Sequence, residues 1–394
     1  MSATVLFIHT AGNWIRGSEN ALLTALCGLD TDLIQPLLVC GNDALADTAR
    51  ARGIEAIVQD MPQLMLDGSS RQIQGIRWLR AVRTIRALAR TRSVQLVYCN
   101  GGSSCQIGYY VAKAVRRPVL CHIHSPYNLR HILLYRLYRA NRVLFVSRAI
   151  QASILKKRAF RGRCEVVYNG VDTRTFAPPE TRDPEWKRKL SIAPHSVVFG
   201  QVSSLIPRKG VDVLLRAFRR VHDEHETARL VVVGDGPHRR ECEHLAYELG
   251  VANAVVFTGQ ADPLPYYQHV FDVNVLASRS DAFPLSLLEA AACGLPNLAA
   301  NVDGIPEAVS DGQTGLLFES EDHLMLANRM LILLKDQALR QKLGEASRRG
   351  AIASFSSESY CATIQRIVCE EAALNVAPDG GAQRCIRRQQ SLPH

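Results

Sequence analysis

Short apolar runs alternate with amphipathic segments along most of the chain. The runs are four to seven residues long, which is typical of strands that are covered on both faces of a parallel sheet. They occupy residues 4–10, 36–40, 54–58, 94–98, 118–123, 143–146, 196–202, 230–233, 255–259, 273–276, 297–300 and 315–318. Segments with a helical period of apolar residues predict helices at 20–29, 44–52, 72–92, 106–113, 212–222, 321–335, 336–349 and 357–373. This alternation predicts an α/β fold with two parallel, doubly wound Rossmann-like domains.

The length supports two domains. A chain of 394 residues exceeds what one ordinary hydrophobic core organises. Prolines at 178, 179 and 184 mark a linker, so we expect an N-terminal domain at 1–176 and a C-terminal domain at 177–350. Residues 374–394 are rich in glycine and arginine, and we expect a loose basic tail there.

Composition favours a cytoplasmic protein. The chain is 47% hydrophobic and 21% charged, and no apolar run is long enough to span a bilayer. The N-terminus enters a strand directly, without the basic segment and cleavage site of a signal peptide. Eleven cysteines are scattered without C-x-x-C spacing, which predicts reduced, buried thiols in place of disulfides or zinc ligands.

Charge divides unevenly along the chain. Residues 1–175 hold 24 Lys and Arg against 10 Asp and Glu, whereas the remainder holds 23 against 27. In the helix at 72–92 an apolar stripe runs beside an arginine stripe, and no acid in the helix balances the arginines. The apolar stripe is Ile76, Leu79, Val82, Ile85, Leu88 and Ala89, and the basic one is Arg77, Arg80, Arg83, Arg86 and Arg90. Further basic residues follow at 130, 136, 139, 142, 156–158, 161 and 163.

A solvated face is the ordinary explanation of such a charge run. The missing acids favour an anionic partner instead, namely a membrane surface. A nucleic acid is disfavoured because few aromatic residues lie among the arginines and no nucleic-acid-binding motif is present.

One stretch of the second domain concentrates the chemistry. Residues 278–306 read S-R-S-D-A-F-P-L-S-L-L-E-A-A-A-C-G-L-P-N-L-A-A-N-V-D-G-I-P. Pro284 suits the first turn of a helix, and Gly294 with Pro296 ends it. Asp281 and Glu289 bracket the helix start, eight residues apart. A helix N-terminus beside a strand end offers free N–H groups and a positive dipole end, so an anion site is expected there.

This stretch resembles the nucleotide-sugar signature of the retaining glycosyltransferases called group 1 or family 4, which have the GT-B fold. Their pattern of E-x7-E, A-x-A-x-G-x-P and G-G-I-P-E appears here as D-x7-E, A-A-A-C-G-L-P and D-G-I-P-E. Asp281 therefore stands where the family usually has glutamate. The resemblance implies two domains facing each other across a cleft, with the final helix at about 357–373 crossing back to the first domain.

The resemblance assigns donor-binding residues to the second domain. The loop S-S-L-I-P-R-K-G resembles the family's G-R-L-x-x-x-K-G, so Lys209 is implied to hold the diphosphate. Ser204 replaces the family arginine, and Arg208 is a candidate second cation. Glu289 is implied to bind the ribose hydroxyls and Asp281 to face the sugar. The remaining donor-binding residues implied are Asp235 and Gly236 of G-D-G-P and Phe283, Pro284 and Leu285 before the signature helix.

The first domain carries two further motifs. Gly17-Ser18-Glu19 resembles the family's G-G-x-E loop, which implies that Gly17 and Ser18 face the donor phosphates. His124 matches the histidine that lies near the transferred sugar, with His122 as a rival two residues earlier. The segment C-E-V-V-Y-N-G-V-D-T-R-T-F at 164–176 resembles the family's I-x-N-G-V-D-x-x-x-F hinge.

The expected function is a retaining sugar transfer from a nucleoside diphosphate sugar to a glycan or lipid-linked acceptor. The expected setting is polysaccharide or glycolipid synthesis at the cytoplasmic membrane face, with the protein peripheral on that face and with no metal or other cofactor. The alternative is a catalytically weak, nucleotide-binding partner subunit, because Ser204 and Asp281 depart from the family pattern. A nicotinamide dehydrogenase is disfavoured because Arg239 replaces the third glycine of G-x-G-x-x-G.

Overall fold

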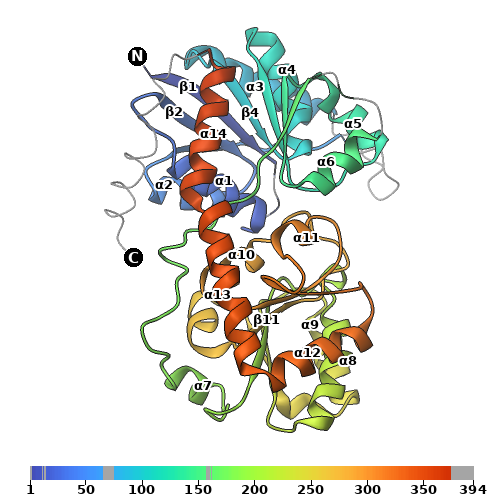
Figure 1. Ribbon diagram of the computed structural model, residues 1–394. Helices are drawn as coiled ribbons and strands as arrows, with labels where there is room; N and C mark the ends of the chain where they lie inside the picture. The colour runs from blue at the N-terminus through green and yellow to red at the C-terminus, as the bar shows by residue number, and fades with distance from the viewer. Residues whose placement is uncertain are drawn as a thin grey trace. The chain divides into compact units, whose positions relative to one another are not determined.

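The computed structural model describes residues 2–10, 12, 15–64, 75–156, 160 and 162–373. The chain divides into two compact units (Figure 1). The first unit combines the N-terminal part through Gly170 with the segment from Ser357 onward, and the second is Val171–Ser356. The second unit thus begins at Val171, where the sequence suggested residue 177. The tail expected at 374–394 lies outside the described residues.

The first unit is built on a seven-stranded parallel sheet in the order β3-β2-β1-β4-β5-β6-β7. Its central strands are buried on both sides, as their continuous apolar runs predict. The strands are β1 (Ala3–His9), β2 (Ile34–Cys40), β3 (Glu55–Val58), β4 (Leu96–Asn100), β5 (Val119–Ile123), β6 (Arg142–Phe145) and β7 (Arg163–Val166).

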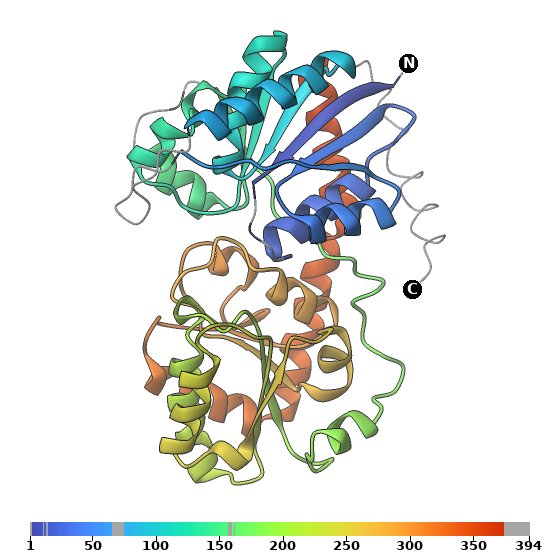
Figure 2. The ribbon, with the colours of Figure 1, turned by 180° about the vertical axis from the view of Figure 1, so that it is seen from behind.

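Helices cover both faces of this sheet (Figures 1 and 2). The helices are α1 (Gly17–Cys27), α2 (Asp43–Ala51), α3 (Gly75–Thr91), α4 (Gly102–Val115), α5 (Leu129–Leu134), α6 (Arg148–Leu155) and α14 (Ser357–Glu371). Helices α1, α2 and α14 share one hydrophobic core with the strands, whereas α3 packs on α4. From α14, Tyr360, Ile364 and Val368 are buried in that core, so the last helix completes the first unit.

The second unit repeats the plan with six parallel strands in the order β10-β9-β8-β11-β12-β13. The strands are β8 (Val198–Val202), β9 (Arg229–Val233), β10 (Val255–Gly259), β11 (Val273–Leu276), β12 (Asn297–Ala300) and β13 (Gly315–Phe318). The helices are α7 (Glu185–Lys189), α8 (Val211–Glu224), α9 (Arg239–Glu248), α10 (Leu285–Ala292), α11 (Ile305–Ala308), α12 (His323–Lys335) and α13 (Gln337–Ser354).

The buried face of α3 differs from the predicted apolar stripe. The residues of α3 that are buried are Trp78, Ala81, Ile85 and Ala89. Ile76 and Leu79, which the prediction placed inside, are 79% and 49% exposed. The indole of Trp78 packs edge-on against Tyr110 of α4, with ring centroids 5.3 Å apart. This large aromatic contact sets the rotation of the helix and turns its first apolar residues outward.

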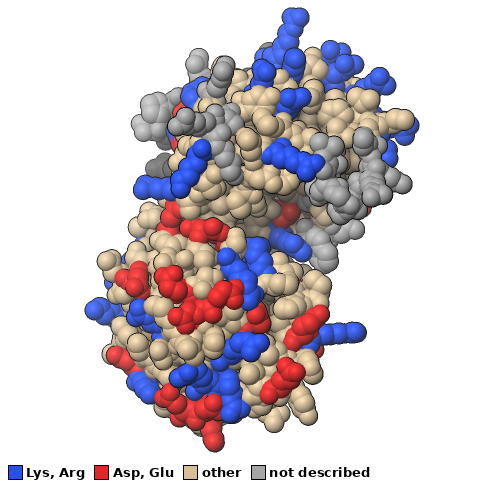
Figure 3. All heavy atoms as spheres, turned by 90° about the vertical axis from the view of Figure 1, so that its right-hand side faces the viewer, with Lys and Arg blue, Asp and Glu red and all other residues tan. Residues whose placement is uncertain are grey.

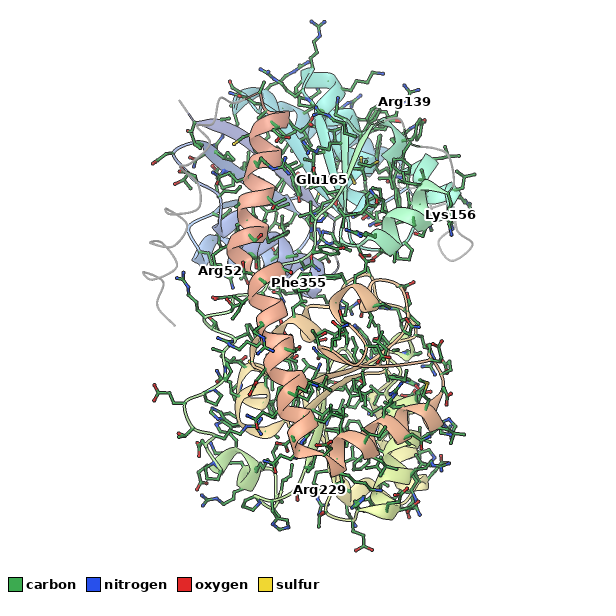
Figure 4. All side chains as sticks on the ribbon, viewed as in Figure 1. Arg52, Arg139, Lys156, Glu165, Arg229 and Phe355 are labelled. Carbon is green, nitrogen blue, oxygen red and sulfur yellow. The ribbon has the colours of Figure 1, made fainter. Side chains whose placement is uncertain are left out.

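The basic residues of the first unit are also less uniform than the sequence suggested. Arg77 pairs with Asp60 at 2.6 Å, so the prediction of an arginine stripe without acidic partners is wrong at this position. Arg142 was counted with the surface cations but is buried in β6. Its guanidinium pairs with Glu165 of β7, labelled in Figure 4, and with Glu370 of α14. In the view of Figure 3, the charged side chains of the first unit are still mostly Lys and Arg, while the second unit shows both signs.

No helix in the described ranges is long and apolar enough to cross a membrane.

Candidate functional site

Each sheet has one point where the strand order reverses direction. It lies between β1 and β4 in the first unit and between β8 and β11 in the second. Open parallel sheets bind ligands outside the carboxyl ends of their strands at such a point, because the two loops diverge there and leave a crevice. The residues that follow these four strands are therefore the ones expected to contact a ligand.

In the second unit, the loop after β8 lies against the end of β9. The N–H of Leu205 donates to the carbonyl of Asp235 at 2.9 Å, and the N–H of Ser203 donates to Val233 at 3.0 Å. Gly234 has a φ of +134°, and a Cβ there would lie 2.0 Å from the carbonyl oxygen of Ser203. The glycine of G-D-G-P is thus required by close backbone approach, independently of any ligand.

The same loop then meets the end of β11. Gly210 has a φ of +64°, and a Cβ on it would lie 1.8 Å from the carbonyl oxygen of Ala277. This approach places Lys209 beside the loop that carries Asp281. The Nζ of Lys209 lies 2.5 Å from Oδ2 of Asp281, and both side chains are almost buried, at 14% and 12% exposure. The two residues that the sequence assigned to the diphosphate and the sugar are therefore ion-paired at the switch point.

Neighbouring groups hold this pair in position. The carbonyl of Asp281 accepts the N–H of Gly304 at 3.1 Å, which ties it to the D-G-I-P segment after β12. The guanidinium of Arg208 lies 3.7 Å from the same Oδ2 and donates to the carbonyl of Ser280 at 2.5 Å. The Lys209 ammonium has three N–H donors, and it donates one of them to Asp281. The arrangement supplies two cations around one carboxylate, which suits an incoming anion.

Glu289 occupies the middle of α10 and is partly buried. The hydroxyl of Tyr267 donates to its Oε2 at 3.2 Å. Burial raises the pKa of Glu289 to about 7, although the hydrogen bond from Tyr267 opposes the rise. A carboxyl with this pKa is poised between its two protonation states near neutral pH. Hydroxyl groups that donate to the ionised form would favour that form.

The other residues assigned to donor binding have structural partners. Phe283 is buried, and its ring packs against Phe355 with centroids 5.4 Å apart. Pro284 has extended backbone angles and precedes the helix, which begins at Leu285, so Pro284 does not sit in the first turn. The carboxylate of Asp235 accepts the N–H of Gly236 at 2.7 Å and thereby stabilises its own turn. The charged side chains gathered at the switch point of the second unit are therefore Lys209, Asp281 and Arg208, with Glu289 on α10 nearby in the sequence.

In the first unit, a chain of polar side chains joins the ends of β1, β4 and β5. The Nε2 of His124 lies 2.8 Å from Oδ1 of Asn100. The Nδ1 of His9 lies 3.0 Å from the carbonyl oxygen of Asn100, and its Nε2 lies 2.9 Å from Glu19. Burial opposes ionisation of Glu19, but the hydrogen bond and charge of His9 outweigh it and lower the pKa of Glu19 to about 2.

This chain fixes the tautomer of His124. The Nδ2 of Asn100 lies 3.1 Å from the carbonyl oxygen of Ser18, and a carbonyl can only accept. The amide group of Asn100 is therefore oriented with its NH₂ toward Ser18 and its Oδ1 toward His124. It follows that Nε2 of His124 carries the proton and that Nδ1 is left as an acceptor. Burial, reinforced by the nearby His122 and His9, holds the pKa of His124 well below its usual value, so the ring is neutral.

The structure separates His124 from its rival. His122 is completely buried, and its Nδ1 lies 2.8 Å from the hydroxyl of Tyr98. Burial also lowers the pKa of His122 to about 3. Its ring centroid lies 4.3 Å from that of His124, so His122 supports the position of its neighbour from inside. His124 is the partly exposed member of the two.

The motif Gly17-Ser18-Glu19, expected in a loop, forms the first turn of α1, which begins at Gly17. A Cβ on Gly17 would meet nothing within 4 Å, so this glycine has open space around it. The hydroxyl of Ser18 donates to Glu19 at 3.0 Å. His9, Asn100 and Tyr267 were not identified from the sequence. A signal was available for the first two, since each is a polar residue at the end of an apolar strand run.

Both units match models of known protein families. The family model described as Glycosyltransferase Family 4 matches residues 16–175, and the model described as Glycosyl transferases group 1 matches residues 182–350. The chain resembles the N-acetyl-alpha-D-glucosaminyl L-malate synthase of Bacillus anthracis, with 31% identity over 52% of each chain. It also resembles the GDP-mannose-dependent alpha-(1-6)-phosphatidylinositol monomannoside mannosyltransferase of Mycolicibacterium smegmatis, with 32% identity over 58% of this chain and 62% of the relative. The matches thus span about half to three-fifths of the length of these two relatives.

Among solved structures, the HepE protein of Anabaena in complex with UDP-glucose superposes with a TM-score of 0.81 at 21% identity. The superposition covers 93% of this chain and 99% of HepE. The expected fold class is confirmed, with two parallel-sheet α/β domains of the GT-B type. The two family models together match most of the chain, which belongs to the glycosyltransferases of the group 1 and family 4 type.

Proposed function

We propose that this chain is a retaining glycosyltransferase that moves a sugar from a nucleoside diphosphate sugar to a glycan or lipid-linked acceptor. The observation that carries the proposal is the ion pair of Lys209 and Asp281 at the strand-order reversal of the second unit. The family resemblance assigns these two residues to the diphosphate and the sugar. The HepE protein was solved in complex with UDP-glucose, and the M. smegmatis relative is a GDP-mannose-dependent mannosyltransferase.

The proposed role of Lys209 follows from the charge of the leaving group. A departing nucleoside diphosphate gains negative charge as the glycosidic bond breaks, and a fixed ammonium stabilises that charge. Arg208 and the N-terminus of α10 add positive potential nearby. We assign this neutralisation to the protein's own cations, with no metal required. When the diphosphate arrives, Lys209 transfers part of its hydrogen bonding from Asp281 to the phosphate.

Glu289 and Asp281 are proposed to accept hydroxyl groups of the donor. A carboxylate can accept two hydroxyls of a ribose ring at once, and the near-neutral pKa of Glu289 leaves that form available. Asp281, released from Lys209, is proposed to accept a hydroxyl of the sugar. Retention is proposed to proceed by attack of the acceptor hydroxyl on the face that the diphosphate leaves, with the leaving phosphate taking the acceptor's proton. His124 is proposed to contact the transferred sugar through Nδ1.

The acceptor and the location belong to the same proposal. The exposed arginines of α3, Arg80, Arg83 and Arg86, favour a peripheral position on an anionic membrane surface, the cytoplasmic face in this case. The M. smegmatis relative is a phosphatidylinositol monomannoside mannosyltransferase. A lipid-linked acceptor would present its hydroxyl at the same surface.

The test is release of nucleoside diphosphate from UDP-, GDP- and ADP-sugars in the presence of lipid-linked and glycan acceptors. We expect turnover with at least one donor, and a rate loss of about tenfold or more for Asp281→Asn, which removes one charged hydrogen-bond partner. Asp281→Glu restores the usual family residue and should keep or raise the rate. Should the parent be inactive while Asp281→Glu is active, the partner-subunit alternative would replace this proposal.

A further inference from the structure

An apolar groove lies on the first unit among α3, α4 and α5. Its volume is about 620 Å³, within the range of pockets that bind small molecules. One wall is formed by Trp78, Leu79 and Val82 of α3, and the opposite wall by Leu133 and Leu134 of α5. None of the described residues that line the groove is acidic.

The leucines of both walls are open to solvent. Leu79 is 49% exposed and Leu133 is 48% exposed. Ile76, one turn before Leu79 on α3, is 79% exposed. Apolar surface that is exposed to water has a higher free energy than the same surface when it is buried. An apolar ligand that covered these side chains would therefore gain binding free energy from their burial.

Residues that line the groove are held in place by contacts with their neighbours. The ring of Trp78 packs edge-on against Tyr110 of α4. The amide of Gln106 accepts the N–H of Leu64 at 2.8 Å and donates to its carbonyl at 3.2 Å. A preformed groove loses little conformational entropy when a ligand enters. In addition, Nε1 of Trp78 is buried and has no hydrogen-bond partner among the described residues, so the wall carries an unused donor.

Two arginines give the groove its charge. Arg130 and Arg136 both line it, and Nη1 of Arg136 donates to the hydroxyl of Tyr138 at 2.9 Å. A guanidinium has five N–H donors in a planar fork that matches phosphate oxygens. The groove thus combines a hydrocarbon surface with phosphate-binding groups. A second copy of this chain is a poor occupant because its first unit carries charge of the same sign.

We propose that this groove binds the hydrocarbon chain of a lipid phosphate, with the phosphate at Arg130 and Arg136. The inference rests on the proposed function, because it identifies the acceptor class as a lipid that carries a phosphate next to its chain. The chain lies against Leu79, Val82 and Leu133. The phosphate stays at the basic rim, where it remains hydrated on one side.

The test uses calorimetry on the full chain without any nucleotide sugar. The probes are farnesyl phosphate, farnesol and inorganic phosphate. We expect saturable one-to-one binding of farnesyl phosphate, at least tenfold weaker binding of farnesol and no measurable heat from inorganic phosphate. Arg136→Gln should weaken farnesyl phosphate at least fivefold and leave farnesol unchanged.

A matched pair of leucine variants separates the groove from a general effect. Leu133→Asp places a charge on the wall and should weaken farnesyl phosphate at least tenfold. Leu155→Asp alters a leucine of α6 that is 38% exposed and lies outside the groove, so it should bind like the parent. Both leucines are surface residues, and circular dichroism checks that each variant is folded.

Three outcomes would overturn the proposal: farnesol binding as tightly as its phosphate, Leu133→Asp binding like the parent, or parent dimers that Leu133→Asp abolishes in sedimentation. The last outcome would show that a second copy of this chain occupies the groove. Because no nucleotide sugar is present in this test, its failure leaves the nucleotide-sugar proposal standing. Failure of nucleotide-sugar binding would leave lipid phosphate binding intact but would remove its assignment as the acceptor.

Discussion

Individual side chains in the two units are positioned by contacts that span long stretches of sequence. Lys209 and Asp281 are 72 residues apart, and their pairing at 2.5 Å depends on the close approach of Gly210 to Ala277. His124 takes its tautomer from Asn100, which is in turn oriented by Ser18. The Lys209–Asp281 ion pair and the tautomer of His124 are therefore set by the packing of loops at the strand ends.

Glu289 should make donor binding depend on pH. Its pKa is raised to about 7, so the carboxylate that would accept ribose hydroxyls is depleted below neutral pH. We expect the affinity for the preferred nucleotide sugar, measured by calorimetry from pH 5.5 to 8.5, to rise by up to about tenfold per pH unit and to level off above the pKa. A nucleotide sugar is used because its diphosphate does not titrate in this range.

The raised pKa of Glu289 also makes the free energy of unfolding depend on pH. Since the folded-state pKa of Glu289 lies above its ordinary value of 4.5, its contribution to stability is present below pH 4.5 and is lost as the pH rises through 7. Glu289→Gln should remove both the pH dependence of binding and this loss of stability. A pH profile of binding that is the same in Glu289→Gln and the parent would show that another group titrates.

Asn100 should control the tautomer of His124. In the parent, ¹⁵N NMR of the histidine side chains is expected to show the Nε2–H tautomer for His124, assigned by its absence in His124→Gln. Asn100→Ala removes the acceptor of that proton, so a mixture of tautomers should appear. Ser103→Ala serves as the control, because Ser103 contacts Thr10 at 2.7 Å and does not touch His124. An unaltered tautomer in Asn100→Ala would contradict the assigned network.

At the level of single elements, α3 has two exposed features. Its arginines at 80, 83 and 86 are exposed, and so are Ile76 and Leu79 beside them. This combination of basic and apolar surface is typical of helices that lie against anionic lipid. Arg77 pairs with Asp60 and Arg90 donates to the carbonyl of Ala114 at 3.4 Å, so Arg80, Arg83 and Arg86 are the residues to test.

Replacing Arg80, Arg83 and Arg86 together with glutamine should weaken binding to anionic vesicles by about a hundredfold, at roughly 1 kcal/mol for each arginine. Co-sedimentation of the parent should decline as salt is added, because the attraction is screened. The control replaces Arg216, Arg220 and Arg240 with glutamine. These three arginines are also exposed, on α8 and α9 of the second unit. Equal binding of the parent to neutral vesicles would rule out an electrostatic cause.

At the level of the whole molecule, elements with strong apolar patterns could be predicted from sequence. The strands at 273–276, 297–300 and 315–318 have the predicted bounds, since each is an apolar run between polar turns. Helix α9 was missed because only Cys242 and Ala246 of it are buried, too few to form a stripe. Strand β7 was missed because its residues are exposed or only partly buried, as is usual at a sheet edge.

The charge of the molecule and its long-range contacts were harder to predict. A count of charges cannot distinguish Arg142, which is buried between Glu165 and Glu370, from an arginine on the surface. Motif spacing identified Lys209 and Glu289, whereas Tyr267, which donates to Glu289, belongs to a π-helical turn at Tyr266–Val270 that no periodicity indicates. Partners of this kind depend on sheet register and helix rotation, which local sequence does not determine.

Binding of a nucleoside diphosphate at Lys209 of the second unit can be measured by calorimetric titration of the full chain with UDP, GDP and ADP. We expect one-to-one binding of at least one of these nucleotides. Lys209→Ala should lose roughly 1–3 kcal/mol of binding free energy, the range for a hydrogen bond to a charged group. The control Lys342→Ala, an exposed lysine of α13, should bind like the parent. The proposed role of Lys209 would be contradicted if the folded parent bound none of the nucleotides, or if Lys209→Ala bound them as tightly as the parent.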